Sequence, residues 1–405
     1  MNVFILCVKI RGVPMKYNFD EIIDRKDTSA EKYIDLEKLY GTSDVIPLWV
    51  ADMDFRTAKP IIDAIKERTE NGIFGYTSRP DSYYDAVCNF QMKRKNWDID
   101  KKLMSFSLGV VPSICMIIKA LSNAEAKIII QTPVYRPFYN AVKDAPRELL
   151  ESPLKEVEGS FNMDYEDIEE KAKQGAKYLI LCSPHNPIGR VWSRDELKKL
   201  GDICLKYDVK VISDEIHSDL ILWGNKHTPF SSISEELRRI TITCIAASKT
   251  FNLAGMQSSI VILPDEKSKG KFDQAWARLH IECNNCFSMV GTQAAFEHGE
   301  EWLEQLLRYI EGNVTFIMDY FKENIPLIIP ICPEGTYLVW LDCRQLGMNG
   351  KQLNKFMVFE AGIAMSSGTY FGKNSEGFMR MNVACPRAIL EKALVQLKTA
   401  VEHLE

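Results

Sequence analysis

Short apolar runs alternate with amphipathic helical patterns through the middle of the chain. Five runs rich in β-branched and other apolar residues predict strands at residues 127–131, 177–182, 209–213, 240–245 and 260–263. Residues 195–207 place apolar side chains at helical spacing after Ser193, a residue type that favours a helix N-cap. Apolar strands separated by such helices predict a mostly parallel sheet that helices cover on both faces.

The last third of the chain has a different pattern. A long amphipathic helix is predicted from about residue 300 to residue 322, and shorter helices and strands of mixed type follow it. An α/β protein is therefore expected, with a large domain built on the mostly parallel sheet and a second, smaller α+β domain.

Composition and charge narrow the class of protein. The 405 residues are 46% hydrophobic and 26% charged, close to the averages of soluble globular proteins. The net charge of −5 and the lack of a basic block argue against a nucleic-acid or membrane-surface partner. No 18-residue apolar run is present, so no membrane-spanning segment is expected.

The eleven cysteines are scattered along the chain, which favours free thiols in a reducing compartment, and we expect a cytoplasmic protein. Cys283 and Cys286 form a lone CxxC pair. Because neither a second pair nor a neighbouring histidine accompanies it, we expect no metal site.

Polar side chains follow three of the predicted strands, where parallel sheets build their ligand sites. Asn186 lies between two X-Pro steps, Asp214 comes directly after a strand, and Lys249 follows the next one. Each has an ordinary explanation alone: a turn residue, a helix cap and a solvated amine. Their shared position at strand ends favours a single site. His217, three residues after Asp214, is either part of that site or a structural histidine.

A phosphate site is a second expectation. The sequence GVVPS at residues 109–113 predicts the start of a helix, with Pro112 as its first residue. Free backbone N–H groups at such a helix start can hold a phosphate group.

Nine collinear motifs carry a family resemblance. They are YNFD (17–20), PLWVADMDF (47–55), FGYT (74–77), QTPVYRPF (131–138), CSPHNPIGR (182–190), SDEIHSD (213–219), ASKTFNLAG (247–255), PEGTY (333–337) and RMNVACPR (380–387). The set resembles the fold-type I pyridoxal 5′-phosphate (PLP) enzymes, the aspartate aminotransferase superfamily. Within it the chain is most similar to the MalY/PatB group of cystathionine β-lyases, or C–S lyases.

The resemblance implies a domain division and a PLP site. Residues 1–14 are expected to be an N-terminal extension, 15–58 the N-terminal part of the small domain, 59–294 the large PLP-binding domain and 295–405 the C-terminal small domain. Lys249 would form the Schiff base with PLP, and Asp214 would pair with the pyridine nitrogen. The other cofactor-binding residues implied are Val110, Val111 and Ser248 at the phosphate, Asn186 at the phenolic oxygen, Tyr135 on the ring face, and His217.

The resemblance also implies how substrate is held. Arg380 would clamp the α-carboxylate of an amino-acid substrate, with Asn186 and Ala51 nearby. Tyr76 would reach the phosphate in a partner subunit, so a homodimer with shared, catalytically interdependent sites is expected. Residues 281–286 and 365–371 depart from the pattern of the group and are expected near the substrate.

Two positions bear on the reaction. Aminotransferases of this superfamily typically carry tyrosine where this chain has His217 and arginine where it has Gln257. The resemblance therefore implies α,β-elimination of L-cystathionine or a related cysteine S-conjugate, giving a thiol (homocysteine), pyruvate and ammonia. A class I/II aminotransferase is one alternative, and a MalY-like protein with an added regulatory binding role is another. The preferred leaving group and the pathway stay open.

Overall fold

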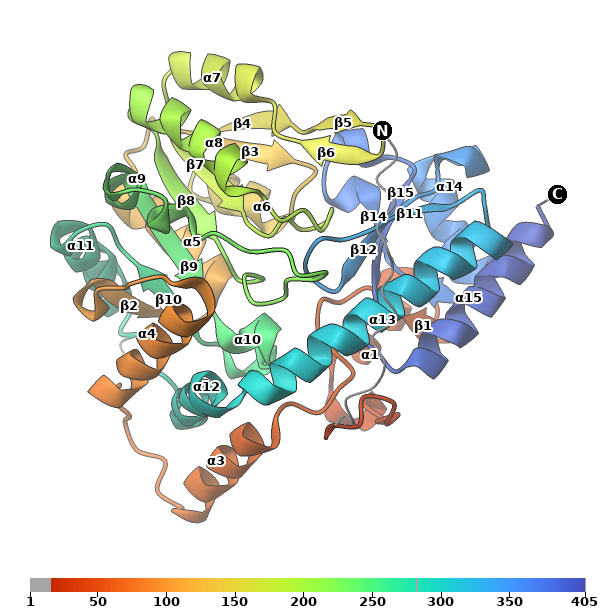
Figure 1. Ribbon diagram of the computed structural model, residues 1–405, viewed down its shortest axis with the longest axis horizontal. Coiled ribbons are helices and arrows are strands. Elements are labelled where there is room, and N and C mark those ends of the chain that lie inside the picture. Colours follow the sequence, from red (N-terminus) through yellow and green to blue (C-terminus); the bar gives the residue numbers. More distant parts are fainter. Residues whose placement is uncertain (1–15, 282, 405) are drawn as a thin grey trace.

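The computed structural model describes residues 16–281 and 283–404, so the expected extension at residues 1–14 lies outside the described part. A seven-stranded sheet forms the centre of the larger part of the molecule (Figure 1), in the order β2-β10-β9-β8-β7-β3-β4. Its strands are β2 (Met104–Ser107), β3 (Lys127–Thr132), β4 (Glu148–Pro153), β7 (Ala176–Cys182), β8 (Lys210–Asp214), β9 (Thr241–Ile245) and β10 (Ser259–Ile262). All five predicted strands are present.

One strand departs from the parallel arrangement. β10 pairs antiparallel with both β9 and β2, whereas the pairs from β9 across to β4 are parallel. Residues 246–258 stay at the carboxyl end of β9 and form the short helix α10 (Ala247–Thr250), so the chain re-enters the sheet in the opposite direction. A central apolar strand has the same pattern in either direction, which is why the sequence does not reveal this reversal.

Helices cover both faces of the sheet, as predicted. One face packs on α5 (Val110–Leu121), α6 (Pro137–Asp144) and α11 (Glu266–Ala277), and the other on α7 (Tyr165–Lys173), α8 (Arg194–Lys206) and α9 (Glu235–Ile240). The alternation shows in β3, where Ile128 and Ile130 join the first core and Ile129 joins the second. The predicted helix after Ser193 is α8, and Ser193 and Glu196 form a reciprocal capping box at its start.

A smaller antiparallel sheet has the order β11 (Ile329–Ile331), β12 (Leu338–Asp342), β15 (Phe378–Asn382) and β14 (Ser366–Ser367). The predicted long helix is α13 (Glu300–Asn324), which runs beside α15 (Arg387–Glu402) in Figure 1. The remaining principal elements are α1 (Glu31–Ile34), α2 (Leu36–Tyr40), α3 (Lys59–Glu70), α4 (Asp81–Lys95), β5 (Lys155–Val157), β6 (Ser160–Asn162), α12 (Cys286–His298) and α14 (Gly350–Lys355).

The N-terminal segment lies against this smaller sheet region. β1 (Ile46–Pro47) pairs in parallel with β13 (Ile363–Ala364), which joins two segments more than 300 residues apart in the chain. This pairing agrees with an N-terminal contribution to the small domain, although the domain boundaries themselves stay a prediction. Among the described helices, none combines the length and apolarity needed to cross a bilayer.

Candidate active site

A cavity of about 190 Å³ lies at the carboxyl ends of β7, β8 and β9. Segments far apart in the chain converge on it, as expected where parallel strands end at one edge. Most of the predicted site residues line it, namely Ala51, Val110, Val111, Tyr135, Asn186, Asp214, His217, Ser248 and Lys249. Gln257, Ser258 and Cys182 also line the cavity.

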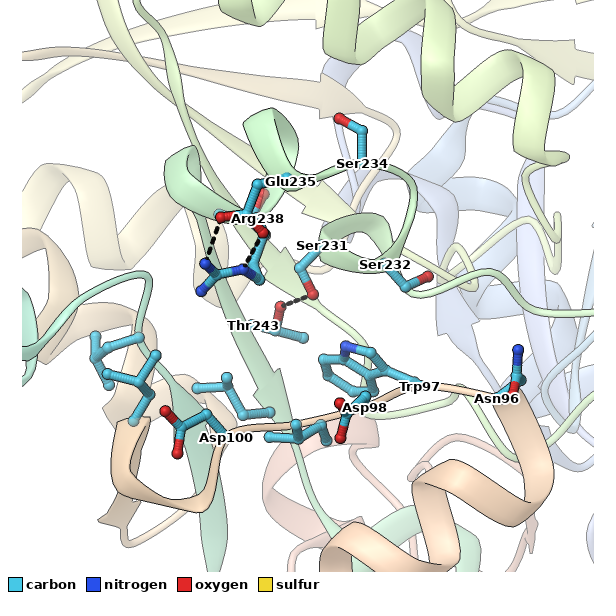
Figure 2. A pocket seen from close by; sticks show the side chains of 15 residues that line it. Asn96, Trp97, Asp98, Asp100, Ser231, Ser232, Ser234, Glu235, Arg238 and Thr243 are labelled. Carbon is cyan, nitrogen blue, oxygen red and sulfur yellow. Dashed lines mark hydrogen bonds and ion pairs between the residues drawn. The ribbon is translucent and has the colours of Figure 1, made fainter.

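A larger cavity than this one lies elsewhere in the molecule. A cavity of about 530 Å³ lies between the segment after α4 and the segment that leads into α9 (Figure 2). Its cation Arg238 is paired with Glu235 through two hydrogen bonds of 2.8 and 2.6 Å. None of the predicted site residues reaches this cavity. The smaller cavity is therefore the candidate, because it gathers the reactive groups.

Lys249 is placed in the cavity by α10, directly after β9. Its Nζ donates a hydrogen bond of 2.6 Å to the backbone carbonyl of Ala51. Burial lowers the pKa of Lys249 to about 8, against the opposing effect of the Asp52 carboxylate. More of this amine is therefore neutral near physiological pH than in an ordinary lysine, and the neutral form is the one that acts as a nucleophile or a proton acceptor.

Asp214 is the last residue of β8 and is buried. Its Oδ1 accepts a hydrogen bond of 3.0 Å from the backbone N–H of Ile216. Burial raises the pKa of Asp214 to about 7, and among the described residues no cation forms an ion pair with it. A protonated ring nitrogen beside this carboxylate would restore its usual ionisation by Coulomb attraction. The pair would fit the pyridine end of PLP.

Arg380, on β15, does not line the cavity itself but contacts Asn186, which does. Its Nη1 donates to Asn186 Oδ1 at 3.0 Å, and its Nη2 donates to the carbonyl of Trp49 at 2.7 Å and to Ser366 Oγ at 3.2 Å. The buried Nε has no hydrogen-bond partner among the described residues. Asn186 thus keeps its amide nitrogen to donate, and Arg380 keeps a donor for an anion.

The predicted phosphate site lies at the start of α5. Val110 is the first residue of this helix, so Pro112 is the third and not, as predicted, the first. A proline fits there because the first-turn N–H groups have no partner within the helix. The N–H groups of Val110 and Val111 are left for a ligand, and the hydroxyl of Ser248 lies at the same cavity.

Two ring residues complete the cavity wall. Burial raises the pKa of Tyr135 to about 12, so its phenol stays neutral. Burial, with Lys249 and Arg380 nearby, lowers the pKa of His217 to about 3, so its imidazole is neutral as well. His217 Nδ1 is buried without a hydrogen-bond partner among the described residues. Within residues 16–281 and 283–404, this nitrogen therefore makes no structural hydrogen bond.

Tyr76 is not brought into the cavity. Its side chain is fully exposed, 103% of the reference area, on the segment between α3 and α4. Its expected role lies in the site of a second subunit and stays a prediction.

The two segments that depart from the pattern of the MalY/PatB group, residues 281–286 and 365–371, do contact residues of the site. Asn284 Nδ2 donates to Ser258 Oγ at 3.3 Å, and Ser366 Oγ accepts from Arg380.

In the described ranges 16–281 and 283–404, no three histidine, cysteine or acidic side chains gather as a metal site requires.

Sequence reasoning placed Ala51 near the substrate but missed that backbone carbonyls of residues 49–53 hold side chains of the site. The carbonyl of Ala51 accepts from Lys249 and also from Tyr337 Oη at 2.9 Å, while that of Trp49 accepts from Arg380. The signal available in the sequence was the run WVADMDF, whose two carboxylates follow these carbonyls directly.

Comparison with known proteins identifies the family. The model of the aminotransferase class I and II family matches residues 43–397. The chain belongs to this family. Among curated proteins it is 40% identical over 385 residues to cystathionine β-lyase PatB of Bacillus subtilis, covering 95% of this chain and 100% of PatB.

Solved structures support the family's fold. A PLP-bound Clostridium difficile protein, provisionally named an aminotransferase, is 51% identical with a TM-score of 0.94, covering 95% of this chain and all of that one. Cystalysin of Treponema denticola, which contains PLP, is 34% identical with a TM-score of 0.94, covering 96% and 100%. The predicted aspartate aminotransferase-like fold and the resemblance to the MalY/PatB group are confirmed. The predicted cofactor is the one that these similar structures contain.

Proposed function

We propose that this family member is a PLP-dependent C–S β-lyase. It would cleave L-cystathionine or a related cysteine S-conjugate into a thiol (homocysteine for cystathionine), pyruvate and ammonia. The observation that supports this most is the joint placement of Lys249 and Asp214 in one cavity whose wall carries His217, in a chain 40% identical to a cystathionine β-lyase.

The cavity has donors and a carboxylate that suit PLP. Asp214 would hold the ring nitrogen, and Asn186 would donate to the phenolic oxygen. The ring face would lie against Tyr135, and the phosphate would take the N–H groups of Val110 and Val111 with the Ser248 hydroxyl. When bound, PLP supplies an electron sink for the negative charge that develops at the substrate Cα.

Lys249 moves the proton in this proposal. Its amine, with a pKa lowered to about 8 by burial, accepts the proton from the substrate Cα. In this structure the same amine donates a hydrogen bond to the carbonyl of Ala51. As the proton leaves, the Cβ–S bond breaks and the electron pair departs with the thiolate. The released enamine then hydrolyses to pyruvate and ammonia.

Arg380 orients the substrate. Its guanidinium is held by Asn186, Trp49 and Ser366, and its unpartnered Nε adds a donor toward an α-carboxylate. A carboxylate fixed in this way aligns the Cα–H bond with the Lys249 amine. The proposal further includes a homodimer in which Tyr76 of each subunit completes the neighbouring site, and a cytoplasmic location.

The first test is incubation of the PLP-loaded protein with L-cystathionine, without any 2-oxoacid, while pyruvate and free thiol are followed together. Both should appear in equal amounts. Lys249→Ala should abolish their release, because the proton acceptor is lost, whereas Lys59→Ala, which removes an exposed amine paired with Asp63, should leave it unchanged.

Two outcomes would overturn the proposal. Amino-group transfer to a 2-oxoacid, without pyruvate from cystathionine alone, would make the protein an aminotransferase. Pyruvate release by Lys249→Ala at the wild-type rate would remove the assigned role of Lys249.

A further inference from the structure

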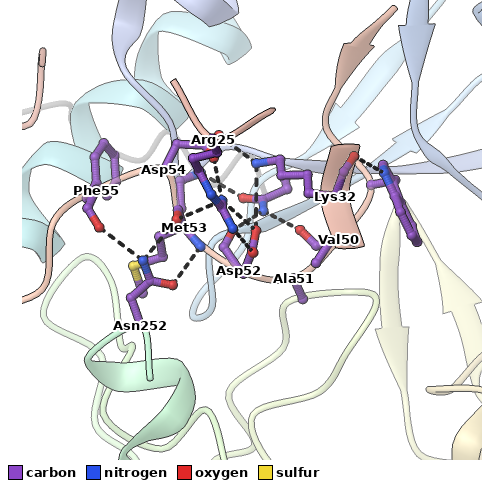
Figure 3. Close-up of polar contacts among 12 residues, drawn as sticks. Arg25, Lys32, Val50, Ala51, Asp52, Met53, Asp54, Phe55 and Asn252 are labelled. Carbon is purple, nitrogen blue, oxygen red and sulfur yellow. Dashed lines mark hydrogen bonds and ion pairs between the residues drawn. The ribbon is translucent and has the colours of Figure 1, made fainter. Parts of the chain in front are cut away.

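Five consecutive backbone carbonyls, those of residues 49–53, accept hydrogen bonds from side chains of other segments. Figure 3 shows the contact between Asn252 and Met53. Trp49 accepts from Arg380, and Ala51 accepts from Lys249. The Nδ2 of Asn382 donates to both Val50 and Asp52 at 2.6 Å, and that of Asn252 donates to Met53 at 2.9 Å. We call residues 49–53 the carbonyl segment; its position sets where the two cationic side chains of the site are held.

Two cations from the N-terminal part of the chain, Arg25 and Lys32, bind the carboxylates in and next to the carbonyl segment. Arg25 binds Asp52 through Nη2 at 2.6 Å and Asp54 through Nη1 at 2.7 Å. Lys32, which is 0% exposed, binds Asp54 at 2.5 Å and lies 3.8 Å from Asp52. Arg25 Nη1 also donates to the Met53 carbonyl at 3.3 Å. We call Arg25, Lys32, Asp52 and Asp54 the ion cluster.

A gain in stability does not by itself explain the ion cluster. Removing charges from water carries a large energetic cost for each ion, and well-packed apolar residues often stabilise a protein equally well. What such a cluster does supply is one defined backbone arrangement, because four groups with matched charges fit in a single geometry. That arrangement is directly next to the carbonyl that holds Lys249.

We propose that Asp52, anchored by Arg25 and Lys32, is a positioning residue for Lys249. It fixes the Ala51 carbonyl that holds the amine, and it places a carboxylate beside that amine. The inference rests on the assignment of Lys249 as the reactive amine, and it holds whether the family reaction is elimination or amino-group transfer.

The charges around Lys249 agree with this role. Burial lowers the pKa of the amine, and among nearby charges the largest opposing effect comes from Asp52. Asp214 and Glu31 act in the same direction as Asp52, and Arg380 acts against them. Asp52 therefore raises the pKa of the Lys249 amine above the value that burial alone would give.

The test uses two variants that remove opposite charges. Asp52→Asn keeps the side-chain shape and removes the carboxylate, so the titration of Lys249 should shift to lower pH. Arg25→Gln removes the nearer of the two cations that face the Asp52 carboxylate, so the titration should shift to higher pH. Glu21→Gln is the control, because it alters an exposed ion pair with Arg56 outside the ion cluster.

The titration is read on cofactor-free protein, by competitive acetylation over a pH series and peptide mass spectrometry of Lys249. The reaction of the PLP-loaded protein is measured in parallel. Because a displaced amine no longer lies in line with the substrate, kcat should fall roughly tenfold or more in both cluster variants, with a smaller change in KM. Glu21→Gln should match wild type in both measurements.

Opposite shifts with a fall in kcat support the proposal. An unchanged titration of Lys249 in Asp52→Asn, or shifts of both variants in the same direction, would overturn it and leave the ion cluster a purely structural feature. If Asp52→Asn does not fold, the direction of the Arg25→Gln shift decides. Failure of the cystathionine assay leaves this titration interpretable, so the two proposals are tested separately.

Discussion

Two ionisable side chains, the buried Asp214 and the partly buried Lys249, define the site at the scale of single residues. Burial raises the pKa of Asp214 to about 7 and lowers that of Lys249 to about 8, from ordinary values of 3.8 and 10.5. Each group is thereby brought close to neutral pH, where small changes in its surroundings alter its charge. Burial in the fold therefore disfavours the charged form of both groups, and a ligand of opposite charge beside either group would favour that form again.

The stability of the cofactor-free protein should report the Asp214 shift. The folded chain keeps a proton on Asp214 that the unfolded chain loses near pH 4. The contribution of Asp214 to the free energy of unfolding should therefore fall as the pH rises from about 4 to about 7. Asp214→Asn lacks this titration, so its stability relative to wild type should rise by about 2 kcal/mol between pH 5 and pH 7.

Urea unfolding of the PLP-free proteins at the two pH values measures this difference. Asp202→Asn, which alters an exposed aspartate paired with Lys198, should show no such change relative to wild type. Equal pH dependence of wild type and Asp214→Asn would mean that the Asp214 carboxyl is not shifted.

At the scale of elements, the strand ends and the start of α5 supply the ligand-binding groups. Gly109 precedes α5 with φ of 151°, a backbone conformation that other residues rarely adopt. This conformation directs the chain into the helix, so that the Val110 and Val111 N–H groups line the cavity.

Gly109→Ala should therefore weaken PLP binding. An added Cβ would lie 3.5 Å from Pro112, an ordinary contact, so the expected cost is backbone strain of about 1–3 kcal/mol. If relief of that strain moves the helix start, the Kd for PLP should rise roughly tenfold.

Absorbance titration of the cofactor-free variant with PLP measures the Kd. Gly270→Ala, at a glycine of α11 with no atom near the added Cβ, is the matched control and should bind PLP like wild type. Wild-type affinity of Gly109→Ala would show that this turn does not position the phosphate site.

At the scale of the whole molecule, one segment exposes apolar side chains that a second subunit would cover. Ile73, Phe74 and Tyr76 are 72%, 56% and 103% exposed, and they follow one another within four residues. Apolar side chains gathered in this way often mark an interface. The expected homodimer would cover them and bring Tyr76 to the neighbouring site.

Mixed dimers test that arrangement. Lys249→Ala and Tyr76→Ala should each have little activity alone. After unfolding and refolding together in equal amounts, one intact site should form in each mixed dimer, restoring about a quarter of the wild-type activity. No recovery, with mixed dimers demonstrated by a tag on one variant, would contradict the shared site.

Much of this architecture was predictable because it depends on local pattern. Apolar runs of strand length and amphipathic helices predicted β3, β7, β8, β9, β10, α8 and α13. The polar residues after those strands predicted where the site would form, since parallel strands end at a common edge. Lys249, Asp214 and Asn186 do line one cavity there.

Other features depend on contacts between distant segments, which no local pattern contains. The reversal of β10, the pairing of β1 with β13 and the hydrogen bond from Lys249 to Ala51 each join residues that only folding brings together. The same holds for the unusual protonation of Asp214 and Lys249, because burial is a property of the folded chain and not of the residue type. The sequence determined which chemical groups are present and in what order, and the tertiary structure decided their distances, partners and charges.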